Sequence, residues 1–445
     1  MRTPIEYLNT SGNKSMRQAI PVERKNRIAS IDTLRGIALL GILLLNIIAF
    51  SGPLASYYDP SAAGSIEGIN LAIAMFIDVS SEGAFRAIFS MLFGAGVLIF
   101  FAKPEADSGV VRSLYYRRTW LLIGFGLLNA YLLLWVGDIL YAYGVTGLLL
   151  YFFKDLTAKK LALCSLCLFL FLGLIHTSSY LFTRSLYNAF TDVSALPIEI
   201  EKSDDQEQIL RDWKSYMEQQ LALPDQIQTE TELRRRGYID NFKFTAQINI
   251  FFQTVNFLFN TFWDAAAMML MGMAFMKWKI LDASRDLGLY IKFMIYGFGV
   301  GLSVNCWEVI TYVRGGFEPF WVATLRPTYD IGRLGMAIGY IGAVMTACKL
   351  EILPRLLHFL ACVGQMALTN YLAQSIICNI IFLGFGFGMF GKMDRVEIYA
   401  IVAVIWIFQI MFSVFWLKRF LYGPAEWLWR SLTYKQAQPL KLRPD

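Results

Sequence analysis

Charged residues inside apolar runs are the first candidates for chemistry in this chain. Four basic residues lie within or at the edges of such runs, and six carboxylates accompany them. If the runs cross a membrane, a charge at the bilayer centre costs about 2.5 kcal/mol or more and normally faces a partner or a wet cavity. The basic residues are Arg35, Arg86, Lys292 and Arg333, and the acidic ones are Asp32, Asp78, Glu82, Asp138, Asp264 and Glu308.

Asp32 and Arg35 are three residues apart at the start of the first apolar run, so on a helix they share a face and can pair. Two interpretations compete. Ser30 or Asp32 caps the helix while Arg35 reaches lipid headgroups, or the planar guanidinium of Arg35 binds a phosphate or carboxylate. The spacing favours neither. Asn46 follows on the same predicted helix.

Glu82 and Arg86 form a second pair, four residues apart. Gly94 and Gly96 follow in the same run and predict close packing against another helix, because small residues let two backbones approach. We favour helix packing over ligand binding for this run, although Arg86 remains a candidate for contact with a substrate.

Asp138 lies in a tight hairpin, just after Trp135 and Gly137, between two predicted spans. It either caps the following helix at its positive end or orients and deprotonates a hydroxyl or amine. Further along, one run contains three amide side chains that either bond between helices or bind a ligand. They are Gln365, Asn370 and Gln374.

The composition places the chain in a membrane. Of its 445 residues, 56% are hydrophobic and 17% are charged, and the mean hydropathy is +0.47. The apolar residues form separate runs of roughly 18 to 25 residues, which is the length of a membrane-spanning helix, and they lack the alternation of a barrel strand. We predict an all-α bundle of about ten spans: 31–50, 83–101, 119–135, 139–153, 161–183, 248–275, 288–311, 330–348, 357–383 and 397–417.

The distribution of Lys and Arg predicts that both termini are cytoplasmic. With residue 1 inside, the inner segments hold 24 of these residues and the short outer loops hold 4. The resulting division is a tail (1–30), a first transmembrane half (31–183), an outer amphipathic segment (184–247), a second half (248–420) and a tail (421–445). We expect the outer segment to be a solvated lid or interfacial helix rather than a binding domain.

Several site classes find no support in the sequence. The chain has no G-x-S-x-G, Walker, H-E-x-x-H or dinucleotide motif. Cys164 and Cys167 form a C-x-x-C, but the only histidines, His176 and His358, lie elsewhere, so we predict no metal site. The cations are dispersed over short loops, and we therefore expect membrane lipids, not nucleic acid, as partners.

Three groups of motifs resemble the bacterial YeiB-like family, whose C-terminal half is the domain of unknown function 418. They are RIASIDTLRGIALLGILLLNI (27–47); FRAIFSMLFGAG (85–96) with RRTWLLIGFGLLNAYLLLWVGDILYAYGVTGLL (117–149); and GQMALTNYLAQS with YGPAEWLWRSLTY (422–434). The resemblance covers nearly the whole chain. It implies a multi-pass protein of the bacterial inner membrane.

The opening D-x-x-R-G pattern is also similar to that of heparan-alpha-glucosaminide N-acetyltransferase and other transmembrane acyltransferases. This likeness implies that acyl-CoA donates from the cytosol, with Asp32 and Arg35 where its charged portion enters, Asn46 further along, and Asp138 on the acceptor side. One departure is Asn129, where many YeiB-like relatives have histidine. Since asparagine cannot act as a general base, either Asp138 moves the proton or this member is not a catalyst of that kind.

The working hypothesis is therefore an acyltransferase-like protein that passes an acyl group from acyl-CoA to an outer sugar, lipid or amine, with Asp138 and Asn129 as catalytic candidates. The main alternative is a transporter or lipid-handling protein in which Arg35, Arg86, Lys292 and Glu308 line a path. A third is a scaffold whose buried charges only fix packing. Whether the chain forms a homodimer is left open.

Overall fold

The computed structural model describes residues 27–57, 59–63, 67–102, 108–197, 201–220 and 223–442. Within these ranges the structure is helical and contains no strand apart from one isolated bridge, between Phe420 and Lys441. The all-α prediction is confirmed.

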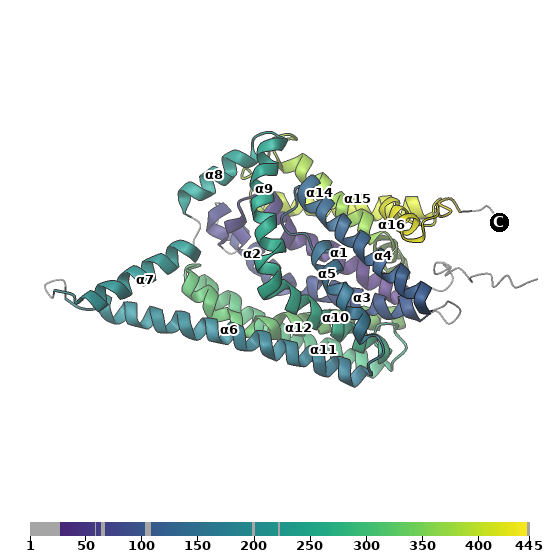
Figure 1. Cartoon of the computed structure of the whole chain (residues 1–445), viewed down its shortest axis with the longest axis horizontal. Coiled ribbons are helices and arrows are strands. Elements are labelled where there is room, and N and C mark those ends of the chain that lie inside the picture. Colours follow the sequence, from purple (N-terminus) through teal and green to yellow (C-terminus); the bar gives the residue numbers. More distant parts are fainter. Residues whose placement is uncertain are drawn as a thin grey trace, which may run out of the picture.

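The helices form one elongated bundle, with a long arm made by α6 and α7 (Figure 1). The α-helices are α1 (Ala29–Ser51), α2 (Gly68–Ser81), α3 (Ala84–Phe101), α4 (Ser108–Leu127), α5 (Leu140–Leu150), α6 (Ala158–Ser194), α7 (Asp204–Gln220), α8 (Pro224–Arg234), α9 (Tyr238–Gln253), α10 (Phe262–Lys277), α11 (Leu287–Arg314), α12 (Pro319–Lys349), α13 (Pro354–Gln365), α14 (Ala367–Phe382), α15 (Arg395–Leu417) and α16 (Pro424–Tyr434). Shorter turns include 3-10 helices η2 (Leu54–Tyr57) and η3 (Pro60–Ala63) and the π-helical segment η4 (Leu128–Leu132).

Seven helices or continuous helix pairs of the described chain are long and apolar enough to cross a membrane, and an eighth span results if α13 and α14 are counted together. These two helices meet at an angle of 79°. The predicted runs 119–135 and 139–153 correspond to α4 with η4 and to the shorter α5, which do not meet this criterion. The count of about ten spans therefore stays a prediction.

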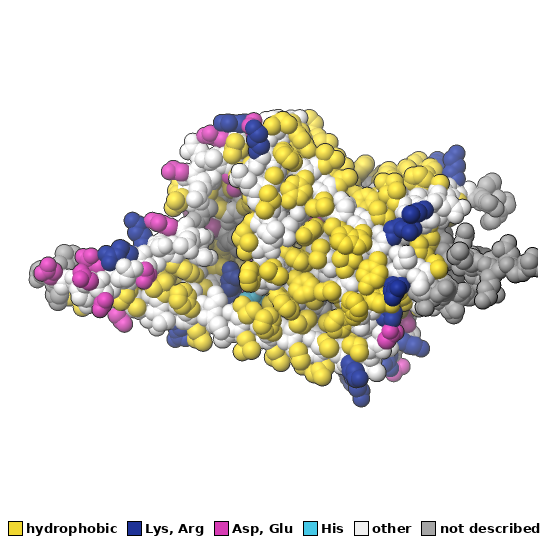
Figure 2. Space-filling view, viewed as in Figure 1, with side chains coloured by type: hydrophobic (Ala, Val, Ile, Leu, Met, Phe, Trp, Pro, Cys, Tyr) yellow, Lys and Arg dark blue, Asp and Glu magenta, His cyan; other side chains and the backbone are white. Residues whose placement is uncertain are grey.

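On the face seen in Figure 2, most charged side chains lie toward the two ends of the apolar bundle. Figure 2 shows hydrophobic side chains over its central part and charged side chains around α7 and α8 at one end and near the termini at the other. The 37 residues of α6 give a helix of about 55 Å, which exceeds the roughly 30 Å of bilayer hydrocarbon. One end of α6 therefore extends beyond the apolar region, toward α7.

The predicted loops on that side are partly helical. The segment predicted to be amphipathic (184–247) contains α7, whose Trp213 packs against Tyr187 and Phe190 of α6. However, α6 continues to Ser194, so the predicted polar segment begins inside a helix. The sequence reading also missed α2, because its 14 residues are too few to register as a span.

Close helix contacts at glycines place α1 at the centre of the bundle. A Cβ atom on Gly36 would lie 2.0 Å from the carbonyl oxygen of Leu360 in α13, and one on Gly364 would lie 1.9 Å from that of Asp32. The glycine of D-x-x-R-G therefore serves packing. Gly94 likewise permits contact of α3 with α10, as predicted, whereas Gly96 faces open space.

Candidate functional site

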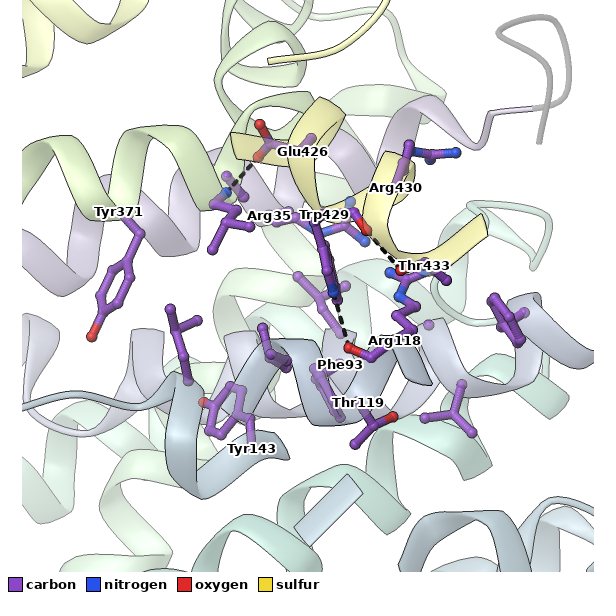
Figure 3. A pocket seen from close by; sticks show the side chains of 18 of the residues that line it. Arg35, Phe93, Arg118, Thr119, Tyr143, Tyr371, Glu426, Trp429, Arg430 and Thr433 are labelled. Atoms are coloured by element: carbon purple, nitrogen blue, oxygen red, sulfur yellow. Dashed lines mark hydrogen bonds between the residues drawn. The ribbon is translucent and has the colours of Figure 1, made fainter. Parts of the chain in front are cut away.

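A cavity of about 210 Å³ lies between α1, α3, α4, α5, α14 and α16. Its lining changes along its length from basic side chains to apolar and phenolic ones (Figure 3). The charged residues that line it are Arg27, Arg35, Arg118, Arg430 and Glu426. Because α1 begins at this cavity and α16 covers it, the two ends of the described chain meet at one end of the bundle.

Asp32 holds two of the four arginines. Its carboxylate accepts from Arg27 Nε at 2.8 Å and from Arg35 Nη1 at 3.1 Å. Asp32 is 4% exposed, whereas about a quarter of the Arg35 side chain remains exposed. The predicted pairing of Asp32 with Arg35 is therefore present, and Arg35 keeps further N–H groups for a ligand.

The other two arginines are held by aromatic rings. The Arg118 guanidinium lies 4.3 Å from the ring centre of Trp429, and that of Arg430 lies 4.5 Å from the ring centre of Tyr422. The indole nitrogen of Trp429 donates to the carbonyl oxygen of Arg118 at 2.9 Å, which fixes α16 to α4. A ring contact leaves the N–H edge of a guanidinium available for a carboxylate or phosphate.

Glu426 ties α16 to the start of α14. Its carboxylate accepts from the backbone nitrogens of Leu368 at 2.6 Å and Thr369 at 3.1 Å, and from the Thr369 hydroxyl at 2.5 Å. These are free N–H groups of a helix N-terminus, where a negative charge is favourable. Burial nevertheless raises the pKa of Glu426, and the hydrogen bonds from Thr369 partly oppose that shift. Counting Asp32, the four arginines face two carboxylates, and the site keeps an excess of positive charge.

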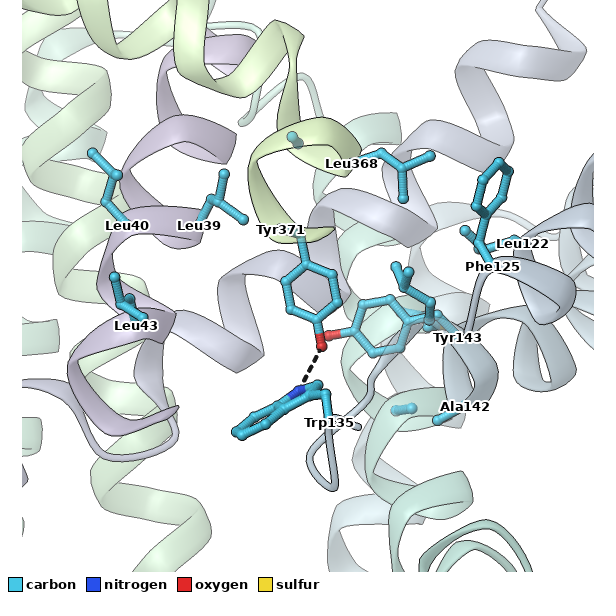
Figure 4. Close-up of a cluster of buried hydrophobic side chains, with 14 of the residues drawn as sticks. Leu39, Leu40, Leu43, Leu122, Phe125, Trp135, Ala142, Tyr143, Leu368 and Tyr371 are labelled. Atoms are coloured by element: carbon cyan, nitrogen blue, oxygen red, sulfur yellow. Dashed lines mark hydrogen bonds between the residues drawn. The ribbon is translucent and has the colours of Figure 1, made fainter. Parts of the chain in front are cut away.

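The inner end of the cavity is apolar apart from two phenols, Tyr143 and Tyr371. The Tyr371 hydroxyl accepts from Trp135 Nε1 at 3.1 Å and from the backbone nitrogen of Ile139 at 3.2 Å (Figure 4). The Tyr143 hydroxyl lies 2.5 Å from Ser90 Oγ. The phenols place hydrogen-bonding groups at the far end of a channel that starts with arginines.

Asp138 and Asn129, the catalytic candidates, lie behind Tyr371 and do not line the cavity. Asn129 Nδ2 donates to Asp138 Oδ1 at 2.9 Å, and the Tyr141 nitrogen donates to Asp138 Oδ2 at 2.8 Å. Asp138 therefore caps the start of α5, which is one of its two predicted roles. Asn129 is fully buried, and its Oδ1 has no hydrogen-bond partner within the described structure.

The bend between α13 and α14 separates the three predicted amides. Gln365 lines the cavity. Asn370 instead donates to Ser413 Oγ at 2.9 Å, and Gln374 donates to Gln409 Oε1 at 3.1 Å, both in α15. Asn370 and Gln374 thus bond between helices. Asn46 lines none of the described cavities.

The remaining intramembrane cations lie outside the cavity. Arg86 and Glu82 do not pair directly, because the hydroxyl of Tyr329 lies between them, 2.9 Å from Arg86 Nη2 and 2.9 Å from Glu82 Oε1. Lys292 is exposed on α11. Arg333 is 3% exposed and pairs with both Asp264 and Asp330. Among the described residues, no group of three or more His, Cys, Asp and Glu could hold a metal ion.

The sequence reading missed Arg118, Arg430, Glu426, Tyr143 and Tyr371. In a count of loop charges, Arg118 and Arg430 only report topology. A partial signal existed, because YGPAEWLWRSLTY combines Glu426 and Arg430 with aromatic residues.

Comparison with known proteins identifies the relatives of this chain. It is 31% identical to the uncharacterized protein YeiB of Escherichia coli (strain K12) over 424 residues, covering 93% of this chain and 98% of that protein. The chain belongs to the YeiB-like family. The family model described as "Protein of unknown function (DUF418)" matches residues 275–436, which include α16 and its two charged cavity residues, Glu426 and Arg430.

Two further proteins, of lower identity, also align over nearly their whole length. The uncharacterized protein YxaH of Bacillus subtilis (strain 168) is 27% identical, with 94% of this chain and 97% of that protein covered. An uncharacterized 39.9 kDa protein in the amylase 3' region of Bacillus acidopullulyticus is 24% identical, and the alignment covers 96% of this chain and 99% of that protein. No solved structure matches the chain.

Proposed function

We propose that this YeiB-like protein is an acyltransferase-like membrane protein that binds acyl-CoA in the arginine-lined cavity and passes the acyl group toward the opposite side of the bilayer. The observation that carries the proposal is the convergence of four guanidinium groups on one end of a cavity whose other end is apolar. An acyl thioester of a nucleotide has this polarity, because a phosphate-rich head is joined by a long arm to an acyl group.

The size of the cavity determines how such a donor would lie. Pockets that enclose a drug-sized ligand measure about 300–1,000 Å³, whereas this one measures about 210 Å³. It therefore suits the arm and acyl chain, with the nucleotide outside against Arg27 and Arg430. Arginine suits that contact, because its fork of donors matches phosphate oxygens.

Acyl transfer would begin at the phenols. It breaks the C–S bond of the thioester, forms a C–O or C–N bond to the acceptor, and moves the acceptor proton to the released thiolate. The Tyr371 hydroxyl, whose donation to the carbonyl oxygen of Gly137 is long at 3.5 Å, could donate to the thioester oxygen. The Tyr143 hydroxyl would first have to release the backbone oxygen of Arg86. Asp138 is the nearest candidate base, and it would need Tyr371 to move aside, because Tyr371 separates it from the cavity.

The proposed orientation places both termini in the cytoplasm and the protein in the bacterial inner membrane. The shared position of Arg27 and α16 at one cavity agrees with termini on one side. A green fluorescent protein fused to the C-terminus tests the orientation, because it should fluoresce and an alkaline phosphatase fusion at the same point should stay inactive. The reverse pattern would place the cavity on the outside.

The direct test is calorimetric titration of the detergent-purified protein with acetyl-CoA, a longer acyl-CoA and free CoA. In the Arg35→Ala variant, the loss of charge-assisted hydrogen bonds should weaken the binding of these ligands about tenfold or more. Arg314→Ala is the matched control, because Arg314 ends α11 and is exposed. Equal affinities in the two variants, or no binding at millimolar ligand, would remove the proposal.

A lipid-handling function is the alternative, and one observation favours it. No histidine lines the cavity, and the buried position behind Tyr371 carries Asn129. In that case the cavity would bind the phosphate and one chain of an anionic lipid without bond cleavage. Binding of lysophosphatidic acid together with failure of acyl-CoA to bind would decide for this function.

A further inference from the structure

A second cavity lies toward the other end of α1. It measures about 50 Å³ and is bordered by α1, α2, α11, α15 and the turns η2 and η3. Ile48 of α1 lines it, whereas Arg35 lines the arginine cavity. Since a helix rises about 1.5 Å per residue, these two positions are roughly 20 Å apart along α1.

The polar lining of this second cavity is acidic and phenolic. Two carboxylates face one guanidinium, which gives a formal excess of one negative charge, in contrast to the arginine cavity. The polar residues with side chains in the lining are Asp78, Glu82, Arg395, Tyr57, Tyr312, Tyr399 and Ser56.

Part of this lining is already held by the protein. Glu82 accepts from the Tyr57 hydroxyl at 3.2 Å and from the Tyr329 hydroxyl at 2.9 Å. Arg395 is 8% exposed, and its Nη2 donates to the carbonyl oxygen of Ser56 at 3.4 Å. These contacts fix the walls of the cavity.

Two groups in the same lining keep free hydrogen-bonding capacity. No hydrogen bond or ion pair within the described structure involves the Asp78 carboxylate. The Tyr312 hydroxyl oxygen is buried and has no hydrogen-bond partner there. A buried polar atom without a partner is costly, which applies to the Tyr312 hydroxyl. Together with the half-buried Asp78 carboxylate in the same lining, it indicates that the cavity receives a polar ligand.

The chemistry of these groups selects the ligand. A carboxylate needs a donor, the excess charge favours a cation, and phenol rings also attract cations through their faces. The volume admits a group of only a few heavy atoms. We propose that this cavity binds a protonated primary amine and, on the premise of the proposed acyl transfer, holds the amine end of the acceptor.

Hydrogen bonds connect this cavity to the arginine cavity. Arg86 donates to the hydroxyl of Tyr329, which also contacts Glu82 in the amine cavity. On its other side, the backbone oxygen of Arg86 accepts from the hydroxyl of Tyr143, which lines the arginine cavity, at 3.3 Å. The two cavities are thus linked through Tyr329, Arg86 and Tyr143, and these contacts would have to open before an acceptor could meet a donor.

Saturation-transfer NMR with the detergent-purified protein tests the site, with ethanolamine as probe and ethylene glycol as its neutral control. Ethanolamine should bind, ethylene glycol should not, and Asp78→Asn should weaken binding about tenfold or more. Asp192→Asn is the matched control, because Asp192 is an exposed carboxylate near the far end of α6. Equal signals from the two probes, or equal binding by the two variants, would overturn the proposal.

Tyr312→Phe provides a second variant if Asp78→Asn does not fold. It removes a hydroxyl without a described partner, so folding should be unchanged, while ethanolamine binding should fall a few-fold. Unchanged binding in this variant would overturn the role of Tyr312 in the amine site.

Binding measurements in nanodiscs distinguish whether the amine belongs to a lipid headgroup or to a soluble molecule. If the ligand is a lipid headgroup, phosphatidylethanolamine should compete with ethanolamine and phosphatidylglycerol should not, whereas a soluble amine would bind equally in both. Because no donor is present, these results are independent of the acyl-CoA titration. Ethanolamine binding without acyl-CoA binding would retain the amine site and remove acyl transfer, and the converse would remove only the amine site.

Discussion

The arginine cavity and the buried cluster around Arg333 differ in how their charges are compensated. In the cavity, four arginines face Asp32 and Glu426, and Arg118 and Arg430 contact rings rather than carboxylates. In the cluster, the single Arg333 pairs with Asp264 and Asp330. Cations with spare donors beside a cavity are suited to bind an anion, whereas a cation matched by two carboxylates in a closed core is suited to hold helices together.

Arg333→Met should give the largest effect, and it should be on stability. The substitution leaves the buried Asp330 and the partly buried Asp264 without their cation, and removal of one partner of a buried pair costs about 3–5 kcal/mol. We expect a markedly lower thermal unfolding midpoint and less monodisperse protein in detergent. Arg314→Met is the control. An unchanged midpoint would show that the cluster does not hold α10 and α12 together.

Arg430→Gln should affect binding more than stability. Arg430 and Tyr422 are half-buried, and a ring contact contributes from about 0.5–1 kcal/mol at exposed sites to about 2 kcal/mol when desolvated, so the unfolding midpoint should fall less than in Arg333→Met. The affinity for free CoA should fall about tenfold, because a charged hydrogen bond is lost, and it should become less sensitive to salt. If stability fell and affinity did not, the comparison between the two regions would be wrong.

The pH dependence of CoA binding should identify Glu426. Burial raises the pKa of Glu426 above its ordinary value of 4.5, so the folded protein takes up this proton at a higher pH than the unfolded chain. The negative charge beside the arginines is lost as the pH falls through this raised pKa, and the affinity for CoA should rise there by a few-fold. The protonation of CoA itself changes equally in measurements on the unaltered protein and on Glu426→Gln. The difference between the two pH profiles therefore measures the contribution of Glu426. Identical pH profiles would exclude Glu426.

The sequence predicts one side of the arginine cavity and misses the other, for a physical reason. Asp32 and Arg35 are recognisable because they lie together in one helix, three residues apart. Arg118 and Arg430 are more than 300 residues apart, and only the packing of α16 on α4 brings them to the same cavity. A charge count by loops cannot distinguish such residues from ordinary topology signals.

The amides show a second limit of reasoning from helical periodicity. Gln365, Asn370 and Gln374 were assigned to one continuous span, which would place them along a single helix. The chain turns by 79° at Met366, so Gln365 lines the cavity while the other two contact α15. The residues around the bend, VGQMALT (363–369), contain no proline that would mark it.

Gly96→Ala should have the smallest effect, and it tests whether the inner half of the cavity holds an acyl chain. Gly96 lines the cavity, and a Cβ atom there would meet no atom within 4 Å. Alanine in a helix should raise stability by about 0.5–1 kcal/mol. The added methyl group narrows the apolar half, so titration should show a few-fold weaker affinity for a long-chain acyl-CoA and no change for acetyl-CoA or free CoA. Equal losses for all three ligands would place the acyl chain elsewhere, because the arginine end is unaltered in this variant.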